Sequence, residues 1–195
     1  MSHRLSDRRY LITGAARGIG LAIATRLVAE GARVMLADVL EEGAERAAEL
    51  GEAAAFIHCD VTSRDQIEAA ITATVERWGG LDGLINNAGI QHVAAIDEFP
   101  TEKWDAIIAI NLTSAFHTTA AALPMMRKSG WGRIINISSA HGLTASPYKS
   151  AYIAAKHGVV GLTKTTALET AQEPITANAI CPGYVLTPLV EAQIP

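Results

Sequence analysis

Residues 10–20 read YLITGAARGIG, an apolar run followed directly by glycines at positions 14, 18 and 20. The apolar run predicts a buried strand, and a pattern of helical period begins within the glycine segment. A strand, a tight turn and a helix N-terminus in this order form the place where an α/β sheet holds the pyrophosphate of a dinucleotide. The spacing is GxxxGxG rather than GxGxxG, so an ordinary strand-to-helix turn is the alternative. The loop residues that we expect to contact the dinucleotide are Gly14, Arg17, Gly18, Ile19 and Gly20.

Strand-like and helix-like segments alternate along the rest of the chain. Short apolar runs predict strands at 10–13, 32–37, 54–58, 84–86, 133–137 and 176–180. Segments of helical period lie between them, at 18–30, 41–50, 63–78, 101–128 and 149–171. This alternation is typical of parallel strands joined by right-handed crossovers. We therefore expect an α/β fold, a Rossmann-type doubly wound parallel sheet of six strands, in a single domain that spans residues 1–195.

The composition argues against nucleic acid or anionic lipid as a partner. The 195 residues are 49% hydrophobic and 18% charged, with a net charge of -4, so no broad basic surface is offered to nucleic acid or anionic lipid. Cys59 and Cys181 lie far apart without metal-ligand spacing, which predicts neither a zinc site nor a disulfide framework. No apolar run approaches the roughly 20 residues of a membrane span, and the start does not resemble a signal peptide. We expect a cytoplasmic protein without a metal.

A carboxylate ends the second predicted strand. Asp38 closes the segment MLAD, eighteen residues after Gly20. A carboxylate at this point hydrogen-bonds the adenosine ribose hydroxyls and repels a 2′-phosphate. The sequence therefore favours NAD over NADP, although the charge of Arg17 in the glycine loop acts in the other direction.

Residues 145–158, ASPYKSAYIAAKHG, contain two tyrosines and two lysines. Tyr152 and Lys156 are four positions apart on a predicted helix and share one face, whereas Tyr148 has no lysine at that spacing and is expected to pack beside the site. An ammonium beside a phenol lowers the phenol pKa from about 10, which makes the pair an acid and base usable near neutrality. Such pairs also occur by chance on solvated helices. Ser139, just past the strand at 133–137, is placed to polarise a substrate carbonyl.

The predicted helix at 101–128 carries a polar residue, Asn111, within an apolar pattern. A buried Asn needs hydrogen-bond partners, so a structural bond and a water-mediated proton relay are both open. The helix is apolar on almost every side, more than one buried face requires. We therefore expect a second copy of the chain to cover part of it in a homo-oligomer.

In chain order, a set of motifs resembles the short-chain dehydrogenase/reductase family. The motifs are TGAARGIG at 13–20, Asp38, the pair Asp60-Val61, NNAG at 86–89, Asn111, Ser139, YIAAK at 152–156 and CPGYVLTP at 181–188. The resemblance covers essentially the whole chain and implies a catalytic tetrad of Asn111, Ser139, Tyr152 and Lys156, with Lys156 also holding the nicotinamide ribose. It also implies cofactor contacts from Asp60, Val61, Asn87, Ala88, Gly89, Pro182, Gly183, Val185 and Thr187.

From residue 86 onward the sequence is similar to family members that oxidise (R)-3-hydroxybutyrate to acetoacetate with NAD+. This resemblance implies a homotetramer, a small 3-hydroxy acid substrate, and a chain that stops within the substrate lid, with the final helices and strand missing. It also implies four side chains around the substrate carboxylate, which needs a cation and several donors once desolvated: Gln91, His141, Lys149 and Gln193. A reductase of 3-oxoacyl thioesters, a polyol dehydrogenase and a non-catalytic NAD-binding module are the alternatives.

Overall fold

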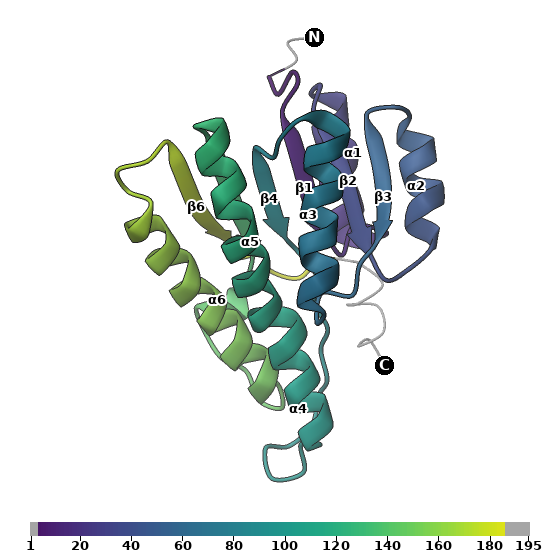
Figure 1. The fold of residues 1–195 in the computed structure, drawn as a ribbon. Helices are drawn as coiled ribbons and strands as arrows, with labels where there is room; N and C mark the ends of the chain where they lie inside the picture. Colours follow the sequence, from purple (N-terminus) through teal and green to yellow (C-terminus); the bar gives the residue numbers. More distant parts are fainter. Residues whose placement is uncertain (1–3, 186–195) are drawn as a thin grey trace.

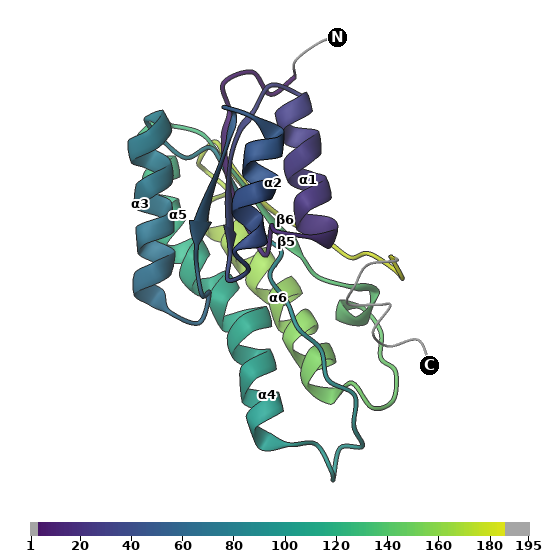
Figure 2. The same ribbon diagram turned by 90° about the vertical axis from the view of Figure 1, so that its right-hand side faces the viewer.

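The computed structural model describes residues 4–185, which form one parallel sheet with helices on both faces (Figure 1, Figure 2). Its strands are β1 (Arg9–Thr13), β2 (Arg33–Asp38), β3 (Ala54–His58), β4 (Gly83–Asn86), β5 (Gly132–Ile137) and β6 (Ile175–Ile180). Their order across the sheet is β3-β2-β1-β4-β5-β6, and every neighbouring pair is parallel. The predicted doubly wound sheet is confirmed, and the order reverses between β1 and β4.

Helices cover the two faces in the order that right-handed crossovers require. One face carries α1 (Gly18–Ala29) and α2 (Glu42–Leu50), and the other carries α3 (Arg64–Trp78), α5 (Ser114–Ser129) and α6 (Ser150–Glu169) (Figure 2). Local sequence sets the ends of these helices. Ser63 caps α3 through its hydroxyl, and Gly79 and Gly130 end α3 and α5 in the left-handed conformation that suits glycine.

Side chains that alternate along the strands build two cores. Leu11 packs with Leu84 and Ile134 in a cluster under α3 and α5. The next residue, Ile12, packs with Leu36 in a second cluster under α1 and α2. Because helices cover both faces, the strands are apolar in both directions, as buried parallel strands are.

The helix expected at 101–128 is a run of three segments, namely α4 (Thr101–Ile108), a π-helical turn η1 (Ala109–Thr113) and α5. The run Thr101–Ser129 is long and apolar enough to cross a bilayer by length and composition. One side of this run packs on the sheet, however. Met126 is fully buried in the sheet core, and Thr118 donates a 2.6 Å hydrogen bond to the Asn86 side chain of β4. The run is therefore a layer of the α/β domain.

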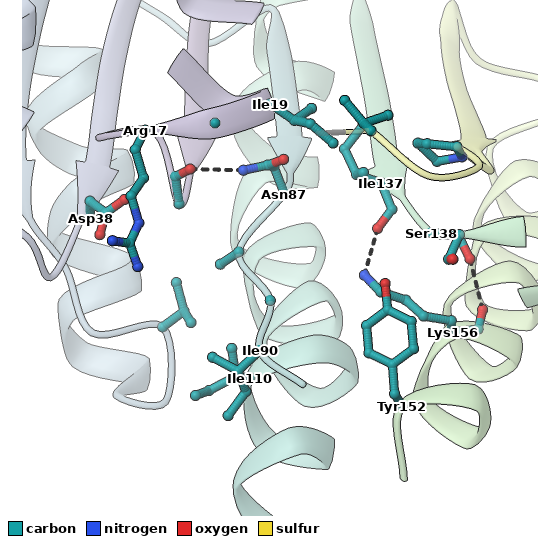
Figure 3. Close-up of a pocket in the computed structure, with 18 of the residues that line it drawn as sticks. Arg17, Ile19, Asp38, Asn87, Ile90, Ile110, Ile137, Ser138, Tyr152 and Lys156 are labelled. Atoms are coloured by element: carbon teal, nitrogen blue, oxygen red, sulfur yellow. Dashed lines mark hydrogen bonds between the residues drawn. The ribbon is translucent and has the colours of Figure 1, made fainter. Parts of the chain in front are cut away.

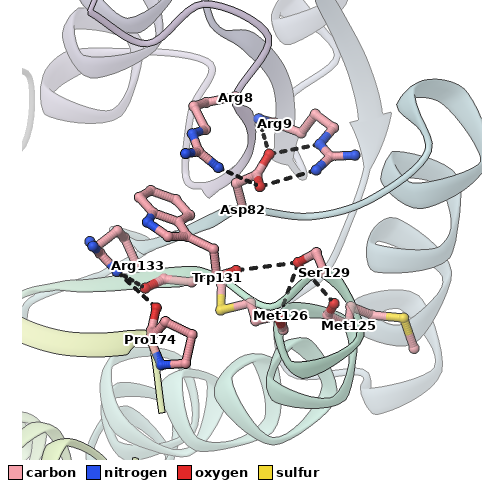
Figure 4. A network of polar contacts seen from close by, with 10 residues as sticks. Arg8, Arg9, Asp82, Met125, Met126, Ser129, Trp131, Arg133 and Pro174 are labelled. Atoms are coloured by element: carbon pink, nitrogen blue, oxygen red, sulfur yellow. Dashed lines mark hydrogen bonds and ion pairs between the residues drawn. The ribbon is translucent and has the colours of Figure 1, made fainter.

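The amino-terminal edge of the sheet is closed by charge pairs (Figure 4). Asp82, 1% exposed, accepts hydrogen bonds from the main-chain N–H of Arg9 at 2.9 Å and from its Nε at 2.7 Å, and Arg8 lies 3.3 Å away. Burial raises the pKa of Asp82, but the bonds and charges of Arg9 and Arg8 outweigh it and hold the pKa below its usual value. The centre of the Trp131 ring lies 3.9 Å from Cζ of Arg8 and 4.1 Å from Cζ of Arg133. This edge stabilises the domain and leaves the opposite edge for ligands.

Candidate active site

A cavity of about 610 Å³ opens at the carboxyl ends of the strands, where β1 and β4 diverge (Figure 3). Ligands of open α/β sheets bind at this point. The predicted site residues that line it are Gly14, Arg17, Gly18, Ile19, Asp38, Asp60, Val61, Asn87, Ala88, Gly89, Ser139, Tyr152, Lys156, Pro182, Gly183 and Val185. The sequence analysis missed Val39, Leu40, Cys59, Ile90, Ile110, Ile137 and Ser138. Five of these seven directly adjoin a predicted residue, and Leu40 and Ile137 lie two residues from one, so their nearness to predicted residues was the available signal. Thr187 and Gln193 lie outside the described residues.

The loop between β1 and α1 requires glycine at particular positions. Gly14 and Gly18 have left-handed φ angles of 64° and 57°, and a Cβ on Gly14 would lie 2.8 Å from the Cα of Ala88. Asn87 donates a 2.8 Å hydrogen bond to the carbonyl of Gly14 and so ties the loop to the segment after β4. Gly20 does not line the cavity. A Cβ there would collide with the Gly14 carbonyl, so glycine is needed for the close approach of α1 to the loop, and its contact with the cofactor stays a prediction.

The start of α1 fits the pyrophosphate of a dinucleotide. Arg17 precedes the helix in an extended conformation and its side chain does not cap the first turn, which also carries no acidic residue. The N–H groups and the positive end of the helix dipole are therefore available to an anion. Within residues 4–185 there is no group of three or more His, Cys, Asp or Glu side chains arranged to hold a metal ion.

Asp38 lies at the far end of the cavity and is 8% exposed. Its carboxylate accepts hydrogen bonds from the main-chain N–H of Ala16 at 2.9 Å and of Leu40 at 3.1 Å. These two bonds fix a negative charge beside the glycine loop, as a ribose-binding carboxylate requires. The neighbouring thiol of Cys59 is not reactive, because burial and the charges of Asp60 and Asp38 raise its pKa to about 11.

Ser139, Tyr152 and Lys156 meet at the other end of the cavity. Lys156 is 4% exposed, and its Nζ donates a 2.8 Å hydrogen bond to the carbonyl of Ile137. The same Nζ lies 5.6 Å from the centre of the Tyr152 ring, as the four-residue spacing predicts. Ser139 accepts a 3.1 Å bond from the N–H of His141, so its own hydroxyl proton is left to donate.

The protonation of this pair differs from the sequence expectation. Burial raises the pKa of the Tyr152 phenol, and its hydrogen bond with Ser139 acts in the opposite direction without reversing the shift. Burial also lowers the pKa of Lys156 to about 8, opposed by Cys181. The expected lowering of the Tyr152 pKa by Lys156 is therefore wrong for this structure. The ammonium bonds a carbonyl rather than the phenol, and removal of both groups from water is the larger effect.

Asn111 lies in the π-helical turn η1 and is 2% exposed. Its Oδ1 accepts from the N–H of Ile90 and its Nδ2 donates to the carbonyl of Ile90, both at 2.9 Å. The side chain does not line the cavity, and its two bonds hold the segment that follows Gly89. The structural bond is therefore present, and the proton relay stays a prediction.

Of the residues expected at the substrate carboxylate, the three that the structure describes, Gln91, His141 and Lys149, are not part of the cavity wall. The His141 ring, in the turn η2 (Ala140–Gly142), lies 6.3 Å from the Tyr152 ring, and its Nε2 is 3.0 Å from the Ser146 hydroxyl. Burial and the charge of Lys149 lower the pKa of His141, so the neutral ring is favoured. Tyr148 was expected to pack beside the site, but it is 60% exposed.

Gln91 follows the wall residue Ile90 and is not itself part of the cavity wall. Of the four substrate residues, the structure thus brings His141 next to the reactive tyrosine and places Lys149 within electrostatic reach of His141.

Known proteins resemble this chain closely. Residues 8–194 match the short chain dehydrogenase family. The D-beta-hydroxybutyrate dehydrogenase of Cupriavidus necator is 55% identical over 195 residues, which cover 97% of this chain and 75% of that protein. The protein of the same name from Rhizobium meliloti is 53% identical over 191 residues, or 95% and 74% of the two chains.

Among solved structures, that of levodione reductase matches with a TM-score of 0.94 and 41% identity, and the match covers 97% of this chain and 76% of that one. A likeness of this extent includes the glycine loop, the strand order and the helix that carries Tyr152. The chain therefore belongs to the short-chain dehydrogenase family and is a nicotinamide-dependent oxidoreductase.

Proposed function

We propose that the protein catalyses the reversible, NAD-dependent oxidation of (R)-3-hydroxybutyrate to acetoacetate. The observation that carries this proposal is the position of His141, whose ring lies 6.3 Å from that of Tyr152 and is acted on by the charge of Lys149, in a chain whose relatives at 53–55% identity are named D-beta-hydroxybutyrate dehydrogenases. A short hydroxy acid carries its charge a few bonds from the reacting carbon. A lysine on the same side of the site as His141 suits such a substrate.

Asp38 supports NAD rather than NADP as the cofactor. Its fixed carboxylate faces the part of the cavity that suits the adenosine ribose, and it would repel the additional phosphate of NADP. Asp60 and Val61, and the segment 87–89 on the other side, complete the walls of this half. When bound, NAD+ supplies the acceptor for the hydride that leaves the hydroxyl-bearing carbon.

Tyr152 is the group that exchanges the proton with the substrate oxygen, as base in oxidation and as acid in reduction. Ser139 donates a hydrogen bond to the same oxygen, because its acceptor side is occupied by the N–H of His141. Lys156 uses one N–H in its bond to the Ile137 carbonyl and has further N–H donors for ribose hydroxyls. Asn111 supports the cavity floor through Ile90.

The first test is the initial rate of NADH formation with (R)-3-hydroxybutyrate and NAD+, beside the S enantiomer and a Tyr152→Phe control. We expect turnover of the R enantiomer that the control loses. Saturable NAD+ binding without turnover of either enantiomer would contradict the substrate assignment and favour a non-catalytic module. Faster reduction of a 3-oxoacyl thioester, or of a cyclic ketone such as levodione, would indicate another branch of the family.

We also infer that the chain self-associates through α5 and α6. Phe116 on α5 is 52% exposed and Leu168 on α6 is 78% exposed, on helices that already bury their other sides. Burial of such side chains contributes about 1.5–3 kcal/mol each. Light scattering coupled to size exclusion tests the inference: wild type should elute as a dimer or tetramer, and Phe116→Glu should shift it to smaller species.

A further inference from the structure

Three consecutive residues at the end of β5 contact the two reactive residues of α6. The carbonyl of Ile137 accepts from Lys156 Nζ at 2.8 Å, and the Ser138 hydroxyl donates to the main-chain carbonyl of Lys156 at 3.0 Å (Figure 3). Ser139 lies close enough to the Tyr152 phenol to lower its pKa. The chemistry of the site therefore depends on how α6 is registered against the end of β5.

The bond from Ser138 is buried and closely fitted. Ser138 is 3% exposed, and its own N–H donates to the carbonyl of Ile180 at 2.8 Å, so the strand end cannot shift freely. A Cβ on Gly142 would collide with the Ser138 hydroxyl and lie 2.8 Å from the carbonyl oxygen of Lys156. The backbone of Gly142 thus closes over the Ser138–Lys156 bond and keeps other partners from it.

A second polar bond joins the same two elements farther from the site. Asn136, 1% exposed, donates to the Thr163 hydroxyl at 2.8 Å. Asn136 and Ser138 share a face of β5 because side chains alternate along a strand. Thr163 lies seven residues, or about two helical turns, beyond Lys156. The Ser138 and Thr163 side chains are both buried. Only the Ser138 hydroxyl forms its bond between β5 and α6 beside the reactive groups.

We propose that Ser138 is a positioning residue for the reaction: its hydroxyl holds α6 at the register in which the Tyr152 phenol meets Ser139 and the Lys156 ammonium meets Ile137. This inference rests on the proposed use of Tyr152 as acid and base. Without the Ser138 hydroxyl, the Lys156 carbonyl keeps only its helical partner, and α6 can move relative to β5. Small misplacements of reacting groups reduce turnover strongly.

Loss of this register has a specific effect on the tyrosine. The hydrogen bond from Ser139 is the influence that lowers the Tyr152 pKa, against burial. The other groups that face the phenol are His141 from η2, at 6.3 Å between rings, and Lys156 from α6, at 5.6 Å. Lys149 acts on His141 and Cys181 acts on Lys156. If Ser138→Ala loosens the Ser139 bond, the phenol pKa rises further.

The test compares Ser138→Ala with the matched control Thr163→Val, each in the full chain. We expect Ser138→Ala to lower kcat about tenfold with KM for NAD+ within about twofold. Because Tyr152 acts as the base in oxidation, the ascending, low-pH limb of the kcat–pH profile should move to higher pH. Thr163→Val should lower the urea midpoint by about as much as Ser138→Ala does, but it should change kcat less than about twofold. Ser138→Thr, which keeps the hydroxyl, should recover most of the turnover.

An ultraviolet difference titration of the phenol, with the Tyr152→Phe background subtracted, makes the test independent of substrate. A raised Tyr152 pKa in Ser138→Ala supports the proposal even if 3-hydroxybutyrate is not turned over, which would overturn only the proposed function. An unchanged phenol pKa in Ser138→Ala, or an equal rise in Thr163→Val, would overturn the positioning role.

Discussion

Replacing Lys156 by methionine should make the chain more stable while removing its activity. The pKa of Lys156 is about 8 in the fold, against 10.5 for a solvated lysine. Each pKa unit corresponds to about 1.36 kcal/mol, so holding this ammonium away from water costs about 3 kcal/mol. Methionine has a similar length and no charge, but it leaves the Ile137 carbonyl without its 2.8 Å donor, a loss of about 1–2 kcal/mol. The net gain expected at pH 7 is about 1–2 kcal/mol.

The gain should depend on pH in a defined direction. Since the folded pKa lies below the unfolded one, the unfolded chain binds more protons between pH 8 and 10.5, and the wild-type free energy of unfolding rises through that window. Lys156→Met lacks this contribution. Its advantage over wild type is therefore largest below pH 8 and shrinks as the pH approaches 10.5.

Urea denaturation of both proteins at pH 7 and near pH 10 measures the effect, with Lys164→Met as a control. Lys164 lies on the exposed side of the same helix, so its replacement should change stability little at either pH. A Lys156→Met protein less stable than wild type at pH 7, or an advantage that does not narrow toward pH 10, would refute the argument that the buried ammonium is destabilising.

Three further predictions concern other parts of the molecule. Asp38→Ala should narrow the ratio of kcat/KM for NAD+ over NADP+ at least tenfold, because it removes the fixed charge that repels a 2′-phosphate; steady-state kinetics with both cofactors would show an unchanged ratio if specificity lies elsewhere. Lys149→Met should raise KM for the hydroxy acid, with a loss in kcat/KM of about 1–3 kcal/mol, and leave KM for NAD+ unaltered. Equal increases in KM for the hydroxy acid and KM for NAD+ would contradict a carboxylate-binding role. Asp82→Ala should lower the free energy of unfolding by about 3 kcal/mol, since it strands Arg9 and Arg8. Because the Asp82 pKa is depressed in the fold, that contribution is present above pH 3.8 and is lost as the pH falls further, so urea midpoints of variant and wild type should converge in acid.

The sheet was predictable from sequence because parallel strands covered on both faces are short apolar runs separated by helical segments. β2 and α6 begin only one residue after their expected starts at 32 and 149. The π-helical turn at Ala109–Thr113 was not predictable, since its residues AINLT fit an α-helix equally well. What distinguishes it is the tertiary bond pair between Asn111 and Ile90, which joins segments twenty-one residues apart.

Much of the candidate site was also accessible, because its residues follow strand ends and the resemblance assigned them by motif. Ser138 was missed for a physical reason: its hydroxyl bonds a main-chain carbonyl of α6, and a sequence does not record where main-chain carbonyls lie. The close approach of Gly20 to the Gly14 carbonyl was likewise not predictable, because it depends on where a main-chain carbonyl lies.

The spacing of Tyr152 and Lys156 identified a charge pair but predicted the wrong sign for the tyrosine pKa, because spacing contains no information on desolvation. Tyr152 packs against a small cluster in which Ile107, Ala151 and Ala155 are fully buried, with Trp104 at its border. Two of these residues come from α4, some fifty positions away in the chain, and they contribute to the burial of Tyr152 only after α4 and α6 meet. A helix with the same YIAAK segment on a solvated surface would keep the phenol near its ordinary pKa. Protonation at this site is therefore a property of the packing of α4 on α6, and the motif alone does not determine it.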